Sequence, residues 1–321
     1  MKISVIGCGR WGSLITWYLS EKKGFDVTLY GRESSEHMQM FLKNRKNDLL
    51  TLPESVKLTT SLSDVSDSDV IVISINSQGL SALMKELRPL ELKNKIFVLC
   101  MKGIEISTGR RLSEVAQAAT DPSNSVAVWI GPGHVQEFYA GIPNCMVIDS
   151  ENDEVKKLLV ESFSGELIRF YYGEDMIGNE IGAAAKNVIG IAAGMLDGYS
   201  LSTLKGALMS RGCREVARLI SAMGGNELSA YGLCHLGDYE ATVFSKFSHN
   251  REFGERFVKG ESMEKLAEGY YTVKALMTLS QEYAVDMPIC RAVYEIIYEN
   301  KDAKETFAHL FERSIKTEFY K

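Results

Sequence analysis

The feature that most constrains the fold is a glycine-rich turn close to the N-terminus. An apolar run at residues 2–7 leads directly into the hexapeptide GCGRWG, and a helical pattern follows over 11–23. Gly7, Gly9 and Gly12 have the spacing G-x-G-x-x-G. A strand, this spacing and a helix, in that order, are typical of a βαβ unit that binds a dinucleotide.

Each of the three glycines has a separate mechanical task in such a turn. We expect Gly7 to permit the sharp turn and Gly9 to let a pyrophosphate approach the backbone. Gly12 would allow the helix to pack closely on the strand. The pyrophosphate then meets free N–H groups and the positive end of the helix dipole.

The end of the next apolar run, 26–31, bears on which dinucleotide is bound. Sites for NAD usually place an acidic residue there to bind the ribose 2′-hydroxyl. This chain instead continues with Arg32, and Glu33 is one or two positions late. A guanidinium can pair with a 2′-phosphate, so we predict NADPH as cofactor, with NADH possible. The alternative is that Arg32 is a solvated loop charge.

The first half of the chain alternates apolar runs with helical patterns. Further strands are expected at 69–76, 95–101, 126–131 and 144–150, with helices between them, for example at 79–88 and 109–119. This alternation predicts an α/β Rossmann domain over residues 1–174, with a doubly wound, mostly parallel sheet.

The second half has little strand signal from about Asp175 onward. Amphipathic helical patterns occur at 204–224, 270–284 and 290–300, and Pro288 is the only proline after Pro143. We therefore expect an all-α domain over residues 175–321.

Composition excludes several classes of function. The formal net charge is −6, which gives no general attraction for nucleic acid. No run is long enough to span a bilayer and the N-terminus does not read as a signal peptide, so we expect no membrane insertion and a cytoplasmic location. The six cysteines are scattered without a C-x-x-C pair, which favours reduced thiols and no metal site.

A lysine lies in the middle of a helix made almost wholly of small and apolar residues, NEIGAAAKNVIGIAAG at 179–194. Gly182, Lys186, Gly190 and Gly194 recur every four residues and fall on nearly one face. We expect this face to approach the cofactor domain closely, with Lys186 reaching into the crevice between the domains.

Seven segments together resemble one known family. In their order and separation the chain is similar to the NAD(P)-dependent sn-glycerol-3-phosphate dehydrogenases, especially the bacterial form, over nearly its whole length. The Lys–Asn and Leu–Gly–Asp segments are the most specific. The segments are GCGRWG, CMKGIE (100–105), IGPGHVQE (130–137), EIGAAAKNVIGIAAG, GLCHLGDYEATV (232–243), SHNREFG (248–254) and EGYYTVKAL (268–276).

The resemblance implies a reaction, a fold and an assembly. The family interconverts dihydroxyacetone phosphate and sn-glycerol 3-phosphate by hydride transfer with a nicotinamide cofactor, chiefly to supply glycerophospholipid synthesis. It implies a helical domain of the 6-phosphogluconate-dehydrogenase-like type and a homodimer. The expected partner is a small phosphorylated substrate.

The resemblance also implies roles for individual residues. Lys186 matches the general acid/base. The substrate contacts would be Lys102, Gly131, Gly133, Asn187, Asp238, Thr242, Ser248, His249 and Asn250. The cofactor contacts would be Gly7, Gly9, Arg10, Trp11, Gly12, Arg32, Lys102, Val135, His249 and Glu268.

The chemistry of a buried lysine suits this reaction independently. Reduction of a carbonyl needs a proton donor at oxygen, and an ammonium group also stabilises the developing alkoxide. Partial burial and the second cation Lys102 would lower the pKa of Lys186, whereas Asp238 would oppose that shift. The alternatives without a role in catalysis are that Asp238 is a helix N-cap and that Lys102 is a solvated residue at the end of a strand. His235 is expected to be packed or at the surface, and Trp11 could line the cofactor region or fill an interface.

The sequence departs from the family at the Ser-Arg-Asn triplet, where His249 replaces the arginine. Histidine has a shorter reach and no bidentate fork, and Arg251 or Lys246 would have to compensate. Gln78 and a short stretch over 250–268 are further departures. Three interpretations remain open: the phosphate is bound differently, a ketopantoate-reductase-like reaction uses another keto substrate, or the chain is a non-catalytic dinucleotide sensor.

Overall fold

The computed structural model describes residues 1–263, 267–315 and 317–318. The chain forms two compact units. The first comprises Met1–Met101 and Leu112–Met176, and the second comprises Lys102–Arg111 and Ile177–Lys321. The division at 174 expected from the sequence assigns 102–111 to the first domain, whereas in the structure this segment packs with the helices of the second unit.

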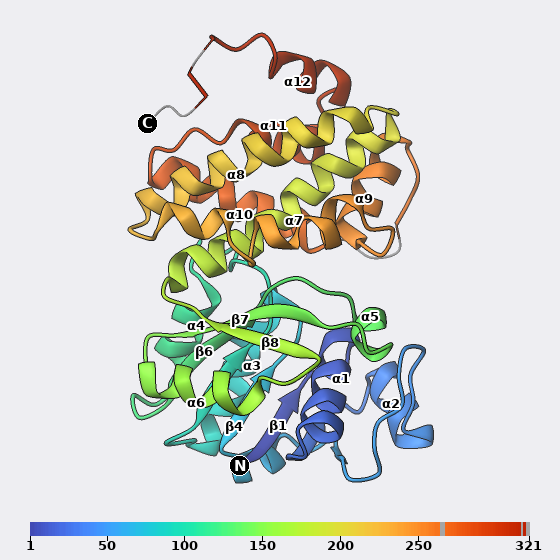
Figure 1. Cartoon of the computed structure of the whole chain (residues 1–321), viewed down its shortest axis with the longest axis vertical. Coiled ribbons are helices and arrows are strands. Elements are labelled where there is room, and N and C mark those ends of the chain that lie inside the picture. The colour runs from blue at the N-terminus through green and yellow to red at the C-terminus, as the bar shows by residue number, and fades with distance from the viewer. Residues whose placement is uncertain (264–266, 316, 319–321) are drawn as a thin grey trace. The chain divides into compact units, whose positions relative to one another are not determined.

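The first unit is built on one eight-stranded sheet with the order β3-β2-β1-β4-β5-β6-β7-β8 (Figure 1). β6 and β7 pair antiparallel and the other described pairings are parallel, so β7 and β8 run opposite to the remaining strands. This confirms the predicted doubly wound, mostly parallel sheet. The short strand β3 and the strand β8 were not predicted. The strands are β1 Lys2–Ile6, β2 Asp26–Tyr30, β3 Lys57–Thr59, β4 Val70–Ile73, β5 Ile96–Leu99, β6 Ser125–Ile130, β7 Asn144–Ser150 and β8 Ile168–Tyr172.

The strand order reverses at β1, because β2 lies on one side of it and β4 on the other. Right-handed crossovers on the two sides of β1 place their helices on opposite faces of the sheet. β4 is buried over its whole length, as expected for a strand covered on both faces. The helices of this unit are α1 Arg10–Trp17, which continues as a π-helical turn over Tyr18–Lys22, α2 Glu36–Asn44, α3 Leu80–Leu87, α4 Leu112–Ala119, α5 Val135–Tyr139 and α6 Asp153–Phe163.

The second unit is helical, as predicted. Its central element is α7, in which every residue from 178 to 196 is buried; a helix that is buried all round is surrounded by other elements. Short turns lie between α8 and α9: Glu227–Tyr231, Leu236–Asp238 and Glu240–Phe244. The helices are α7 Met176–Gly198, α8 Lys205–Ala222, α9 His249–Val258, α10 Glu268–Glu282, α11 Pro288–Tyr298 and α12 Ala303–His309.

The glycines of α7 are needed for packing within this unit. A Cβ built on Gly194 would lie 1.8 Å from the Arg251 carbonyl of α9, and one built on Gly254 would lie 2.0 Å from the Ile191 carbonyl of α7. The two helix backbones therefore touch through reciprocal glycines. A Cβ on Gly190 would likewise lie 2.7 Å from the Thr242 methyl group.

The expectation that this glycine face serves contact with the cofactor domain is therefore wrong. The space beside these glycines is filled by α9 and by the turns over 235–244 of the same unit. Periodicity reveals that a face needs small residues, but it does not identify the element that packs there.

Among the described residues, no helix has the combination of length and apolar character that crossing a membrane requires.

Candidate active site

The glycine turn has the geometry that its spacing predicts. Gly7 has a φ of +114°, and a Cβ there would lie 2.1 Å from the Ser74 carbonyl that follows β4. A Cβ on Gly12 would lie 1.9 Å from the Gly7 carbonyl. Around Gly9, by contrast, a Cβ would meet no described atom within 4 Å. Two glycines therefore allow close packing and the third leaves open space beside the backbone.

The first turn of α1 fits an anionic ligand. Within the described chain, no side chain caps this helix at Gly9 and its first turn holds no acidic residue. A pyrophosphate placed at this turn would meet the leading N–H groups and the positive end of the helix dipole. Arg10 and Trp11 are the first two residues of this turn. The residues present fit the predicted dinucleotide, whose nicotinamide would supply the hydride when bound.

The turn after β2 lies against the glycine turn. A Cβ on Gly31 would lie 2.7 Å from the Cys8 sulfur, and that sulfur is 3.3 Å from the Ser35 hydroxyl, which caps α2. This contact is not among those predicted from the sequence, although a glycine directly after a strand is a signal for it. Arg32 follows Gly31 and its side chain is exposed, so its assignment to a 2′-phosphate stays a prediction.

The loop over 131–135 is joined to the glycine turn through aromatic packing. Trp11 packs edge-on against Phe138 of α5, with ring centroids 5.9 Å apart, which answers the question of where Trp11 packs. Gly131 and Gly133 have φ values of +145° and +139°, and a Cβ on Gly133 would collide with the Phe138 ring. Val135, the first residue of α5, is buried, which leaves its backbone as the group able to meet a ligand.

The second unit contains a cluster of two lysines and one aspartate. Lys186 Nζ lies 2.5 Å from Asp238 Oδ2, and Lys102 Nζ lies 2.7 Å from the same oxygen. Lys186 also donates to the Thr242 hydroxyl at 2.8 Å, and this hydroxyl donates to the Asp238 carbonyl. The structure thus brings together four residues that are dispersed over 140 positions of sequence.

The electrostatics of this cluster suit a proton donor. Lys186 is only 7% exposed. Burial lowers its pKa to about 8, the Asp238 carboxylate opposes that shift, and the nearby Lys102 ammonium adds to it. Asp238 is 1% exposed and its carboxylate faces the lysines. The N-cap interpretation of Asp238 is therefore wrong. The cap position of its 3-10 turn is occupied by His235 instead.

A chain of amide hydrogen bonds runs beside the cluster. The Gly269 N–H donates to Asn250 Oδ1 at 2.8 Å, and Asn250 Nδ2 donates to Asn187 Oδ1 at 3.0 Å. Asn187 Nδ2 then donates to the Lys102 carbonyl at 3.0 Å. The chain fixes the orientation of both asparagine side chains and connects α10, α9 and α7 to the segment that carries Lys102. Both ends of the Asn250 amide are engaged within the protein.

A buried ion pair anchors the other end of that segment. Arg111 Nη1 lies 2.8 Å from Glu180 Oε2, and both side chains are nearly inaccessible. Ile104, which lies between Lys102 and Arg111 in the sequence, is fully buried. These contacts explain why 102–111 packs with the helices. Arg111 and Glu180 are not among the residues predicted from the sequence, although a glutamate in a stretch of small residues is a usable signal.

Ser248, His249 and Asn250, which correspond to the family's Ser-Arg-Asn triplet, lie at the start of α9. Ser248 caps this helix by accepting the Arg251 N–H at 3.3 Å, and His249 is its exposed first residue. The Arg251 guanidinium pairs with Asp197 and Glu255, each at 2.9 Å, so it is engaged elsewhere and is poorly suited to replace the missing arginine. Lys246 is exposed, with Nζ 5.5 Å from the Phe247 ring centroid.

Glu268 and His235 both lie in the second unit. Glu268 is the first residue of α10, directly before Gly269. His235 is completely buried, in line with the expectation that it is packed. The glycine turn, Arg32 and the 131–135 loop belong to the first unit; Lys102, Lys186, Asn187, Asp238 and Thr242 belong to the second, as do Ser248, His249, Asn250 and Glu268.

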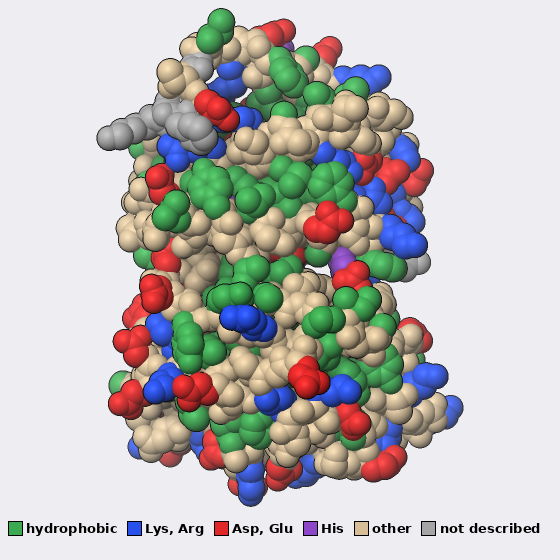
Figure 2. Space-filling model, viewed as in Figure 1, with side chains coloured by type: hydrophobic (Ala, Val, Ile, Leu, Met, Phe, Trp, Pro, Cys, Tyr) green, Lys and Arg blue, Asp and Glu red, His purple; other side chains and the backbone are tan. Residues whose placement is uncertain are grey.

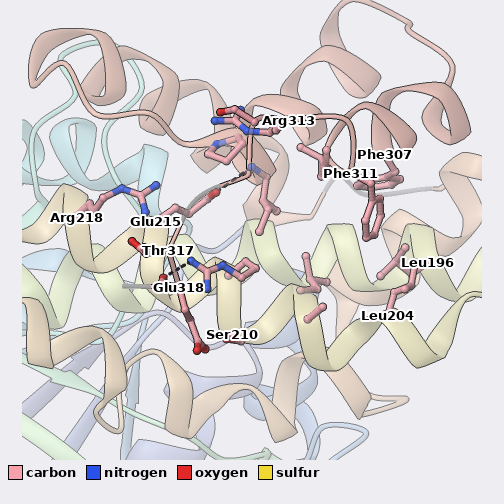
Figure 3. A pocket seen from close by; sticks show the side chains of 17 residues that line it. Leu196, Leu204, Ser210, Glu215, Arg218, Phe307, Phe311, Arg313, Thr317 and Glu318 are labelled. Atoms are coloured by element: carbon pink, nitrogen blue, oxygen red, sulfur yellow. Dashed lines mark hydrogen bonds between the residues drawn. The ribbon is translucent and has the colours of Figure 1, made fainter. Parts of the chain in front are cut away.

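A cavity of about 630 Å³ lies elsewhere in the second unit, among α7, α8, α11, α12 and the segment after α12 (Figure 3). Phe307, Phe311 and Leu196 form one side, while Arg218 and Glu215 lie on the other. The lysine cluster does not contribute to the described lining, and we assign the cavity no part in the chemistry.

Comparison with known proteins now identifies the family. The family model described as NAD-dependent glycerol-3-phosphate dehydrogenase N-terminus matches residues 2–156, and the corresponding C-terminus model matches residues 175–308. The chain is 36% identical to the glycerol-3-phosphate dehydrogenase [NAD(P)+] of Prosthecochloris aestuarii, covering 99% of this chain and all of that one. The crystal structure of glycerol-3-phosphate dehydrogenase from Coxiella burnetii is similar with a TM-score of 0.89 and 29% identity, over 97% of this chain and 99% of that one.

The ketopantoate-reductase interpretation has weaker support. A ketopantoate reductase from Ralstonia eutropha is similar with a TM-score of 0.63 but only 13% identity, over 96% of this chain and all of that one, and such a likeness shows a shared fold alone. Glycerol-3-phosphate dehydrogenases, in contrast, match in sequence over the full length. The chain belongs to the NAD-dependent glycerol-3-phosphate dehydrogenase family.

Proposed function

We propose that this chain reduces dihydroxyacetone phosphate to sn-glycerol 3-phosphate with NADPH or NADH, in a reversible reaction that supplies glycerophospholipid synthesis. The observation that carries the proposal is the buried cluster in which Lys186 and Lys102 share one oxygen of Asp238. The cluster presents a proton donor of suitable pKa within a family whose members are named for this activity.

Lys186 is proposed to give its proton to the C2 oxygen of the substrate. The ammonium group stabilises the negative charge that develops on this oxygen as the carbonyl is reduced. With a pKa of about 8, Lys186 is mostly protonated at neutral pH and still a strong enough acid to transfer its proton. In the reverse direction the neutral amine accepts the proton of the alcohol.

Asp238 and Thr242 are proposed to aim the Lys186 ammonium. Both accept from it, at 2.5 Å and 2.8 Å, which leaves the third N–H of the ammonium for the substrate. Lys102 adds a second positive charge beside the reacting oxygen. Asn187 and Asn250 hold the Lys102 backbone in place through their amides.

The substrate phosphate is proposed to bind without the family arginine, at the start of α9 and near His249. The exposure of His249 at the first position of a ten-residue helix supports this site, because helix N-termini favour anions. Ser248 and Gly131 and Gly133 are proposed as further substrate contacts. The loss of a bidentate fork is expected to weaken phosphate affinity.

For the cofactor, we propose the glycine turn as the pyrophosphate site and Arg32 as the group that favours NADPH. Further proposed cofactor contacts are Arg10, Trp11, Lys102, Val135, His249 and Glu268. We further propose a cytoplasmic homodimer. Figure 2 shows hydrophobic side chains gathered on a face of the helical unit, and exposed apolar groups such as Leu201, Leu228 and Phe311 support association through this unit.

A substrate panel tests the proposal. The rate of NADPH and NADH oxidation is measured with dihydroxyacetone phosphate and, in parallel, with ketopantoate. We expect rapid oxidation only with dihydroxyacetone phosphate. Preference for ketopantoate would favour the keto-acid interpretation, and cofactor binding without turnover on either compound would favour a sensor.

A further inference from the structure

The residues on both sides of Asp238 form a buried hydrogen-bonded network that the proposed reaction does not use directly. His235 is completely buried. Its Nδ1 lies 2.8 Å from the Gly182 carbonyl of α7, and its Nε2 lies 2.7 Å from the Tyr239 hydroxyl. The two rings pack edge-on with centroids 4.8 Å apart. Burial raises the pKa of the Tyr239 hydroxyl, and the Cys213 thiol of α8, which lies near this hydroxyl, adds to the shift.

The direction of each hydrogen bond follows from the chemistry of the partners. A carbonyl only accepts, so His235 Nδ1 carries the proton and Nε2 must accept from Tyr239. The tyrosine thereby donates its only proton to His235. Burial lowers the pKa of His235 to about 4 and the Lys186 charge adds to this shift, so the ring is neutral at pH 7. A neutral ring satisfies every bond in the network.

This network holds the backbone at both Lys186 and Asp238. In an α-helix the Gly182 carbonyl accepts the N–H of the residue four positions later, which is Lys186. His235 therefore bonds the carbonyl that also holds the Lys186 backbone. Asp238 lies three residues after His235 and directly before Tyr239, and its N–H donates to the His235 carbonyl at 3.1 Å.

Asp238 needs such support because its two carboxylate oxygens are held unequally. Both lysines bind Oδ2, whereas Oδ1 is buried and makes no hydrogen bond among the described residues. Small movements of the turn over 236–238 would thus redistribute the carboxylate between Lys186 and Lys102. Two charged groups lie near enough to His235 to alter its pKa. The Lys186 ammonium lowers this pKa, and the Asp238 carboxylate raises it.

We propose that His235 and Tyr239 are positioning residues for the proton donor, because they fix the turn that carries Asp238 to the turn of α7 that carries Lys186. The proposal rests on the proposed role of Lys186 for its consequence in catalysis, but not for its structural part. Neither residue touches the substrate. Without the network the turn loosens, water reaches Lys186 and its proton is no longer aimed.

Tyr239→Phe is the direct test, since it removes one hydroxyl and keeps the ring. The matched control is Tyr18→Phe, because Tyr18 is also buried and its hydroxyl also donates to a protein acceptor, the Phe163 carbonyl at 2.6 Å. We expect Tyr239→Phe to lower kcat for dihydroxyacetone phosphate about tenfold or more, as slight misplacement of a catalytic group does. The KM for the cofactor and the rate of the control should change little.

A second measurement does not depend on turnover. Trace acetylation of Lys186 with acetic anhydride, quantified by mass spectrometry across pH, reports the midpoint of its titration. We expect the midpoint to rise in Tyr239→Phe, because burial is the largest cause of the lowered pKa and loosening admits water. His235→Asn, which keeps a donor for Gly182 but loses the acceptor for Tyr239, should shift it the same way and serves if Tyr239→Phe does not fold.

The kinetic and the labelling measurements distinguish failure of the proposed function from failure of the positioning role. If the wild-type protein does not reduce dihydroxyacetone phosphate, the proposed function fails and the labelling arm still decides the positioning role. If kcat and the Lys186 midpoint in Tyr239→Phe equal those of Tyr18→Phe, the positioning role is overturned, whatever the wild-type activity.

Discussion

Lys186 and Asp238 form a buried ion pair, with Nζ 2.5 Å from Oδ2, and the same carboxylate oxygen also holds Lys102 at 2.7 Å. One negative charge is thus shared by two ammonium groups. Removing Asp238 would leave two neighbouring ammonium groups, one of them buried, without their shared counter-charge, which is strongly unfavourable. The pairing explains how lysine is tolerated in a helix of small residues, and it raises the pKa of Lys186 against the larger lowering effect of burial.

The first prediction concerns pH. Because Lys186 must be protonated to reduce a carbonyl, the rate of reduction should fall as pH rises through its pKa of about 8. Asp238 raises this pKa, so Asp238→Asn should move the alkaline limb of the kcat profile to lower pH. Steady-state rates across pH for both proteins provide the measurement. A limb that stays in place in Asp238→Asn would separate Lys186 from the observed titration.

The second prediction concerns the role of Arg32 in the choice between NADPH and NADH. Arg32→Ala should raise the KM for NADPH about tenfold, as expected for loss of a charge-assisted phosphate contact, and should change the KM for NADH little. Initial rates with each cofactor at saturating substrate are compared. Glu33→Ala is the neighbouring control, since its side chain is also exposed. Equal losses with both cofactors would reject the assignment to the 2′-phosphate.

The third prediction tests the phosphate site. His249→Arg restores a bidentate fork at the start of α9 and should lower the KM for dihydroxyacetone phosphate several-fold. Lys246→Arg is the matched control, because Lys246 is a nearby exposed cation outside the triplet. An unchanged KM in His249→Arg would mean that the phosphate is held at another anchor.

The fourth prediction concerns the contact between α7 and α9. Gly194→Ala would place a methyl group 1.8 Å from the Arg251 carbonyl and should lower the free energy of unfolding by about 3 kcal/mol or more. Gly206 is the contrasting glycine, because a Cβ there meets no described atom within 4 Å and it lies in α8. Gly206→Ala should instead stabilise the protein by about 0.5–1 kcal/mol. Urea unfolding followed by circular dichroism gives both values, and similar values for the two variants would refute the close packing.

Much of the architecture could be predicted from local sequence. Apolar runs and glycine spacing identified the sheet, its connection to α1 and the helical second half, because these signals depend on short-range periodicity. The strand β3 has three residues and β8 alternates buried with exposed positions, so neither gave a clear apolar run.

The partners of individual residues depend on contacts distant in sequence. The glycines of α7 indicated a close approach, but only the fold shows that α9 makes it. The Arg111–Glu180 pair joins residues 69 positions apart, and the amide chain from Gly269 to Lys102 spans three helices. The lysine cluster itself was grouped correctly only because the family resemblance supplied its members.

The proposed function depends above all on Lys186 as the proton donor in the reduction of dihydroxyacetone phosphate. The most direct measurement is kcat for this reduction in Lys186→Ala beside the wild-type protein, with cofactor affinity determined on both. We expect a loss of about 10²- to 10⁴-fold in kcat and nearly unchanged cofactor affinity, because the glycine turn belongs to the other unit. A Lys186→Ala protein that retains wild-type kcat would contradict the claim.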